Sequence, residues 1–210
     1  MNKSFDMVIL TRSIKHGEYC VAGIDVHTGQ WIRLVSDDVS TEGALTRKDL
    51  LMDNHNIAEL LDVAHVKNAE YCPTPVQTEN YRIDRKTTLG YLGRTTIEDV
   101  LKHYPQPKKN EIFIGSSSVI QPWRIGKIDH SLELHTVTDL TFYKAEKSKA
   151  DFSIGQQRFC GYSMTDQRYY DYCDRKLTIQ AANIVCSLPD DKWARDNCYC
   201  KFIAAIYEIK

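Results

Sequence analysis

Long apolar runs, recognised catalytic signatures and flexible linkers are all missing from this sequence of 210 residues. No stretch approaches the roughly 18 apolar residues that a membrane-spanning helix needs. Residues 1–14 also lack the apolar core of a secretory signal. We therefore expect a cytoplasmic protein that has no membrane partner.

Common enzyme motifs are absent as well. The chain has no GxSxG, GxxxxGK[ST], GxGxxG, HExxH or DxDxDG pattern, which removes the usual signatures of hydrolases, phosphate-binding loops, dinucleotide sites, zincins and calcium loops. We assign no catalytic residue and no cofactor, and we expect the protein not to be an enzyme. An enzyme with an unmarked active site is the alternative that sequence leaves open.

The cysteines do not suggest a disulfide framework or a metal site. There are seven of them, an odd number spread through the chain, and no CxxC or HxxxH pair is present to build a tetrahedral site. Cys198 and Cys200 alternate along a predicted strand and so point to opposite faces. We predict free thiols and no bound metal.

What the chain does contain is enough apolar residues for a sizeable core, 42% of the total, and many short alternating segments. These patterns predict strands, listed in chain order: 7–13, 18–26, 30–36, 64–71, 77–84, 112–117, 122–128, 132–140, 158–165, 169–173, 177–188 and 198–209. Helices are predicted over 44–52, from its helix-forming residues, and over 96–103, where Thr95 and Glu98 resemble a capping box.

The strands divide into two groups of similar size. Residues 1–128 suit one small five-stranded barrel with short helices inserted, and residues 129–210 suit a second one. No Gly/Ser-rich segment separates them, so we expect the two barrels to pack together. The predicted fold class is mainly β.

The most regular pattern is the hairpin over 19–35. A three-residue turn ending at Gly29 would pair Ile24 with Ile32 and give one face that is entirely apolar. The other face would then carry Asp25, Trp31 and Arg33. These three suggest either a ligand platform, with Trp31 stacking a base and Arg33 contacting phosphate, or a buried layer with an Asp25–Arg33 ion pair.

Charge is nearly balanced, with a net charge of −1, but it is unevenly placed along the chain. Residues 36–62 are acidic, whereas 81–94 and 102–127 are basic and interleaved with aromatic residues, among them Tyr81 and Trp123. Cations mixed with aromatics are typical of grooves that bind single-stranded nucleic acid. Solvated loops whose aromatics point inward would look the same.

Four segments of the chain resemble the prokaryotic dual-OB domain family: ILTRSIKHGEYCVAGIDVHTGQWIRLVS, QTENYRID, RFCGYSMTDQRYYD and VCSLPDDKWARDNCYCKFIAAIYEIK. The resemblance covers nearly the whole chain. It implies two OB-like barrels and a module that binds or senses nucleic acid in bacterial defence loci, often beside an effector enzyme. It transfers no residue role, but it adds weight to Lys15 and His16, because OB barrels commonly bind ligands with the loop between their first two strands.

Two functions follow as hypotheses. The first is a nucleic-acid-binding module whose contacts are Lys15, His16, Trp31, Arg33, Tyr81, Arg82 and Arg85. The second is a scaffold subunit that docks a protein effector encoded nearby through acidic residues, namely Asp37, Asp38 and Glu42. The near-neutral charge indicates that any nucleic-acid binding is weak or assisted by a partner.

Overall fold

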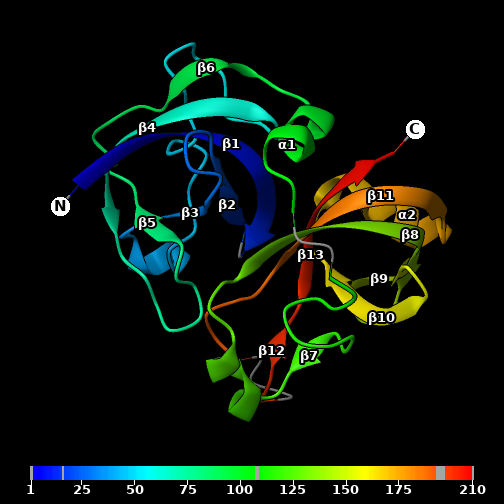
Figure 1. The fold of residues 1–210 in the computed structure, drawn as a ribbon. Coiled ribbons are helices and arrows are strands. Elements are labelled where there is room, and N and C mark those ends of the chain that lie inside the picture. Colours follow the sequence, from blue (N-terminus) through cyan, green and yellow to red (C-terminus); the bar gives the residue numbers. More distant parts are fainter. Residues whose placement is uncertain (1, 16, 107–108, 193–196, 210) are drawn as a thin grey trace. The chain divides into compact units, whose positions relative to one another are not determined.

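The chain folds into two compact units (Figure 1). The computed structural model describes residues 2–15, 17–106, 109–192 and 197–209, with only the backbone for Lys15. Unit 1 consists of Met1–Pro73 and Glu79–Pro105, and unit 2 consists of Thr74–Thr78 and Gln106–Lys210.

Unit 1 contains a closed ring of five strands. In chain order they are β1 (Asn2–Lys15), β2 (Glu18–Asp25), β3 (Trp31–Val35), β4 (Asp62–Tyr71) and β5 (Asn80–Arg82). The ring runs β1-β2-β3-β5-β4 and closes through pairing of β4 with β1, and β3 and β5 are parallel. A further strand, β6 (Gly90–Arg94), pairs with β4, and the helix α1 (Ile97–His103) follows it.

Alternation along the strands builds the core of this unit. Phe5, Met7 and Ile9 lie at every second position of β1 and belong to the core cluster of this unit, as expected for one face of a strand, while Val8 and Leu10 on the other face are also buried. Ile32 and Leu34 of β3 join the same cluster. The barrel interior is therefore filled by side chains, as in other small closed barrels.

Unit 2 repeats this arrangement. Its five strands are β8 (Leu132–Lys144), β9 (Ser148–Ile154), β10 (Gln157–Met164), β11 (Thr178–Ser187) and β13 (Phe202–Glu208), and they close as β10-β13-β11-β8-β9. Counted within the unit, neighbours again follow the order first, second, third, fifth, fourth, and the third and fifth strands are parallel. The mainly β fold with two OB-like barrels is confirmed.

Shorter elements complete unit 2. The 3-10 helix η3 (Gln167–Tyr169) and the helix α2 (Tyr170–Arg175) connect the third and fourth barrel strands. The strand β7 (Val119–Ile120) pairs with β12 (Tyr199–Cys200), and the 3-10 helix η2 (Pro122–Lys127) follows β7. Unit 1 has a 3-10 turn, η1 (Val39–Thr41), between its third and fourth strands.

The division between the units lies earlier than the predicted boundary at residue 128. All barrel strands fall on the expected sides of that position, but the residues from Gln106 onward cluster with unit 2. Ile112 and Phe113 are buried in the core of the second barrel. The Phe113 backbone N–H also donates to the buried Glu133 carboxylate over 2.6 Å, so this connecting segment is part of the second unit.

The predicted helix over 44–52 is wrong, because this segment is irregular. Leu45, Leu50 and Met52 are buried in the core of unit 1, and a backbone bridge joins Leu45 to Tyr19 of β2. The segment turns so that all three side chains reach the core. Burial in the tertiary structure thus outweighs the helix propensity of these residues.

The predicted strand over 169–173 is also wrong. Tyr169, Tyr172 and Cys173 follow helical spacing, and both tyrosine rings pack on Phe142. Asp166 caps the preceding turn by accepting from the Arg168 N–H at 3.1 Å. Clustered tyrosines are typical of strands, but the i, i+3, i+4 spacing of Tyr169, Tyr172 and Cys173 suits a helix packed on a barrel.

Other differences are smaller. The segment 122–128, predicted as a strand, forms mainly η2, the segment 112–117 has no strand, and β6 and β9 were not predicted. Helix α1 is present, but its N-cap is Thr96, whose hydroxyl accepts from the Asp99 N–H. The cap thus lies one residue later than the predicted capping box.

Within the described residues, no helix has the length and apolarity to cross a membrane, and no group of three or more His, Cys, Asp or Glu side chains is placed to hold a metal ion. All seven cysteines are thiols outside any disulfide. Only Cys173, Cys186 and Cys198 are buried, whereas Cys160 is exposed.

Candidate nucleic-acid interface

The hairpin of β2 and β3 has a different register from the predicted one. Ile24 lies opposite Trp31 and Gly23 opposite Ile32, and a backbone bond from the Asp25 N–H to the Gln30 carbonyl closes a four-residue loop. Gly29 has the predicted left-handed conformation, with φ of 71°. The extra loop residue shifts the pairing by one position and thereby changes which residues share a face.

Trp31 and Arg33 therefore share a face with Ala22 and Ile24. Ala22 and Ile24 are fully buried, Arg33 is 6% exposed, and Trp31 is half-buried. An Arg33 Nη atom donates to Glu79 at 3.4 Å, and both side chains are buried. This favours the structural interpretation of Arg33, because a buried, paired guanidinium is poorly placed to reach a phosphate.

Asp25 has a role in the turn. Its carboxylate accepts from the backbone N–H groups of His27 at 2.8 Å and Thr28 at 3.1 Å. An aspartate that accepts from the following backbone amides stabilises a turn. The predicted Asp25–Arg33 ion pair is not formed, since Arg33 pairs with Glu79 instead.

Tyr81 and Arg82 point to opposite sides of β5. The Tyr81 ring packs on Phe5 and Tyr71 at centroid distances of 5.0 and 5.2 Å, and burial raises the pKa of its hydroxyl. Arg82 is on the outer side and pairs with Glu70 at 3.2 Å, where both side chains are about half exposed. Of these two, only Arg82 is presented to solvent, and its exposed ion pair is weak.

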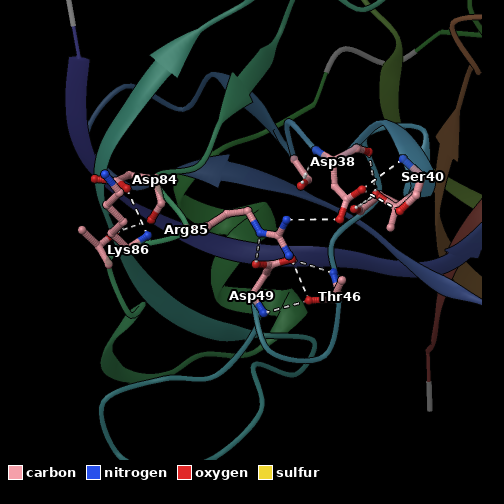
Figure 2. Close-up of polar contacts among 11 residues, drawn as sticks. Asp38, Ser40, Thr46, Asp49, Asp84, Arg85 and Lys86 are labelled. Atoms are coloured by element: carbon pink, nitrogen blue, oxygen red, sulfur yellow. Dashed lines mark hydrogen bonds and ion pairs between the residues drawn. The ribbon is translucent and has the colours of Figure 1, made fainter.

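Arg85 lies between two carboxylates of the acidic segment (Figure 2). Its Nε donates to Asp49 at 2.9 Å and its Nη1 donates to Asp38 at 3.2 Å. These two acids raise the pKa of Arg85, Asp49 most strongly. Bonds from Ser40, followed in importance by Arg85, lower the pKa of Asp38. A predicted nucleic-acid contact and a predicted partner contact thus neutralise each other.

The remaining predicted residues are not joined into one surface. Asp37 and Glu42 are exposed on either side of η1. Lys15 ends β1, with only its backbone described, and His16 lies outside the described residues. The residues proposed from sequence are thus divided among a buried ion pair, a ring packed inward, the Arg85 ion-pair cluster and separate exposed positions. Their part in ligand binding stays a prediction.

Trp123 stands out as a large exposed ring. It is 77% exposed, and the exposed cations Arg124 and Lys127 lie on the same 3-10 helix, η2. Within the part of the chain that the structure describes, no acid pairs with either cation. An indole ring beside cations can stack on a base while the cations neutralise phosphate.

Hydrogen bonding ties this helix to a loop region of the second barrel. β7, just before η2, pairs with β12, which lies in the connection between the fourth and fifth barrel strands, β11 and β13. The Lys201 backbone N–H extends this pairing to the Ser118 carbonyl at 2.9 Å. The connection between strands four and five is one of the loops with which OB folds bind oligonucleotides. Trp123 is therefore presented beside a typical ligand-binding region.

Sequence reasoning noted Trp123 within a basic segment but did not select it. The available signal was an indole directly after a proline and before an arginine, outside any apolar alternation. That signal was masked by the prediction of a strand over 122–128, which would have buried every second side chain. Exposure of the ring became evident only from the fold.

Comparison with solved structures gives two distant likenesses. One is the HINa domain of Ifi202 in complex with 20-bp dsDNA, with 6% identity, 99% of this chain and 97% of that chain covered and a TM-score of 0.41. The other is a chain described under "Structural mimicry for functional antagonism", with 7% identity, 96% and 88% covered and a TM-score of 0.40. Neither likeness is close enough to bear on function. No curated protein matches the chain. The model of the dual OB-containing domain matches residues 5–206, and the chain therefore belongs to the dual OB-containing domain family.

Proposed function

We propose that this chain is a non-enzymatic module that binds exposed single-stranded nucleic acid through Trp123, Arg124 and Lys127. The observation that carries the proposal is the 77% exposure of the Trp123 ring, beside two cations and on a segment paired with the loop between barrel strands four and five. Tryptophan is enriched at binding interfaces, where its large ring supplies contact area and its N–H a polar contact. The placement also suits the ligand-binding loops of OB folds.

The test is fluorescence anisotropy with labelled single-stranded DNA and RNA over a salt series. Trp123→Ala should weaken binding by about 1–3 kcal/mol, the contribution of one base stacked on an aromatic ring. The double variant Arg124→Ala/Lys127→Ala should reduce the salt slope by about 1.4, because each phosphate contact on a single strand contributes about 0.7.

Tyr71→Ala is a matched control, because Tyr71 is also an exposed aromatic, at 53%, but lies in unit 1. Its affinity should equal that of the wild type. Absence of binding at low salt, or equal affinity of the Trp123→Ala variant, would reject the proposal.

A second candidate function is docking of a protein partner through the η1 region. Val39 is 90% exposed between Asp37 and Glu42, which gives a small apolar contact flanked by acids. Because Asp38 is already paired with Arg85, the exposed Asp37 supplies negative charge to this surface. Co-purification of the neighbouring gene's product, lost in Val39→Asp but retained in Trp123→Ala, would favour this function over the first.

We also propose that the module senses nucleic acid in the cytoplasm as part of a bacterial defence system. Family resemblance supports this proposal. Deleting the gene should lower resistance to phage, and the Trp123→Ala variant should fail to restore it. Full restoration by that variant would separate the defence role from the proposed surface.

A further inference from the structure

A groove of about 310 Å³ opens on the second unit, away from the residues used above. It lies where the β8–β9 connection, the end of β10 and the starts of α2 and β13 meet. Its lining includes Lys144, Lys147, Ser148, Ser163, Tyr170 and Phe202. Strand register brings these segments together, since Lys144 pairs with Ser148, and Ser163 pairs with Phe202.

Two lysines and several hydroxyl groups form the polar part of the groove, and Lys149 lies next to Ser148 in the chain. Ser148 and Ser163 are 6% and 8% exposed, and each hydroxyl accepts from a lysine: Lys144 at 3.5 Å and Lys149 at 2.8 Å. Lys149 also donates to the Gly161 carbonyl. These acceptors are neutral, so they leave the positive charge of the ammonium groups in place. The site therefore favours an anion.

Glu146 is exposed between Lys144 and Lys147 in the β8–β9 connection, and Asp174 lies near the rim. Asp174 is 4.0 Å from the Lys144 Nζ, and the two side chains are 65% and 51% exposed. Exposed ion pairs at such distances contribute little, about 0–1 kcal/mol. An anionic ligand could therefore replace Asp174 as the partner of Lys144 at small cost.

The other part of the groove is apolar and aromatic. Tyr170 and Phe202 are both half-buried, Tyr170 packs against the core of the second barrel, and Met164 also lines the groove. A volume of about 310 Å³ is at the lower end of the range for ligand pockets, roughly 300–1,000 Å³. Such a groove suits one nucleotide and is too small for several.

We propose that this groove binds a nucleoside monophosphate unit, free or at the end of a strand. The phosphate contacts Lys144 and Lys147, and the base lies against Tyr170 and Phe202. A nucleoside monophosphate can contact both the aromatic rings and the lysines. Inorganic phosphate would not contact the rings, and a nucleoside would not contact the lysines. The proposal goes beyond the Trp123 surface and depends on none of its residues.

Titration of the ¹⁵N-labelled full chain with AMP and UMP, followed by two-dimensional NMR, tests the proposal. Shifts should concentrate on backbone amides around the groove. In the double variant Lys144→Ala/Lys147→Ala, affinity should fall by about tenfold or more for each lysine, the loss expected for a hydrogen bond to a charged group. Lys67→Ala/Lys102→Ala, which removes two exposed lysines of unit 1, should bind as the wild type does.

Adenosine and inorganic phosphate complete the titration as separate probes. Each should bind more weakly than AMP. Equal binding of either probe, shifts spread away from the groove, or unchanged affinity in Lys144→Ala/Lys147→Ala would overturn the proposal. The charge-reversed variant Lys144→Glu/Lys147→Glu changes only exposed positions, so loss of binding there cannot be ascribed to a collapsed core.

The two sources of the ligand are separated with oligonucleotides. If the groove takes a strand end, a 5′-phosphorylated oligonucleotide should bind more tightly than its 5′-hydroxyl form, and Lys144→Ala/Lys147→Ala should abolish the difference. If it takes free nucleotide, the two oligonucleotides should bind equally while AMP still binds. Because Trp123→Ala should leave AMP binding unchanged, failure of the Trp123 surface and failure of the groove give different results.

Discussion

Replacing Glu133 tests how unit 2 holds the segment that precedes its barrel. This carboxylate is 6% exposed and accepts from four donors: the Phe113 N–H at 2.6 Å, and Lys109 Nζ, His130 Nε2 and His135 Nε2, each at 2.9 Å. Glu133→Ala leaves the buried Phe113 N–H and His135 without this acceptor, at about 1–3 kcal/mol for each group. We expect unit 2 to lose about 3–5 kcal/mol of stability, the usual result of removing one partner from a buried ion pair.

The same network makes stability depend on pH. Its hydrogen bonds and ion pairs lower the pKa of Glu133, against the opposing effect of burial, so its contribution is complete above about pH 4.5 and falls as pH drops through the folded pKa. The bond to Glu133 raises the pKa of His130, so its contribution is complete below about pH 6.5 and falls as pH rises through the folded pKa. Unit 2 should be most stable between these values, and Glu133→Ala should flatten both sides.

Urea denaturation followed by hydrogen exchange and mass spectrometry measures this effect in each unit separately. Asp191→Ala, which removes an exposed acid of the same unit, is the matched control and should change stability by less than about 0.5 kcal/mol. A loss below about 1 kcal/mol in Glu133→Ala, or an unchanged pH profile, would refute the view that this carboxylate anchors the connecting segment.

Two further variants test unit 1. Arg85→Ala should destabilise it by about 1 kcal/mol, because Arg85 is one-third exposed while Asp49, which loses this partner, is 4% exposed. The affinity for oligonucleotides should not change. A large loss of affinity would show that Arg85 contacts the ligand despite its pairing with Asp38. Gly23→Ala would place a Cβ atom 1.8 Å from a backbone oxygen of β1, so we expect at least about 3 kcal/mol of destabilisation. Thermal unfolding measures both variants, with Gly126→Ala, which has open space around it, as the control that should melt like the wild type.

Much of the fold could be predicted because the alternation of apolar and polar residues along a strand is visible within a short stretch of sequence. β8, β10 and β11 carry their own patterns and lie close to the predicted ranges. Register is different, because it depends on loop geometry: a single extra residue in the 26–29 loop placed Ile24 opposite Trp31. One position of error changes the partner of every residue on the hairpin.

Exposure was harder to predict than secondary structure. Arg33 and Trp123 both appeared in sequence as aromatic or cationic members of mixed segments, yet Arg33 is 6% exposed and Trp123 is 77% exposed. Burial of Arg33 depends on Glu79, which is 46 residues away in the chain. No window of sequence contains that partner, so the candidate surface could be located only once the fold was known.

The pairing of the acidic and basic segments could, however, have been anticipated from topology. Parallel strands end at the same edge of a sheet, and Val35 of β3 lies opposite Arg82 of β5. The chain that leaves β3 with Asp38 therefore starts beside the chain that leaves β5 with Arg85, and the two side chains bond at 3.2 Å. What sequence presents as separate acidic and basic regions becomes one cluster of paired charges, in which Asp38 and Asp49 share the Arg85 guanidinium. The charges that follow two parallel neighbouring strands should therefore be added together. In unit 1 that sum argues against Arg85 as a contact for an anionic ligand.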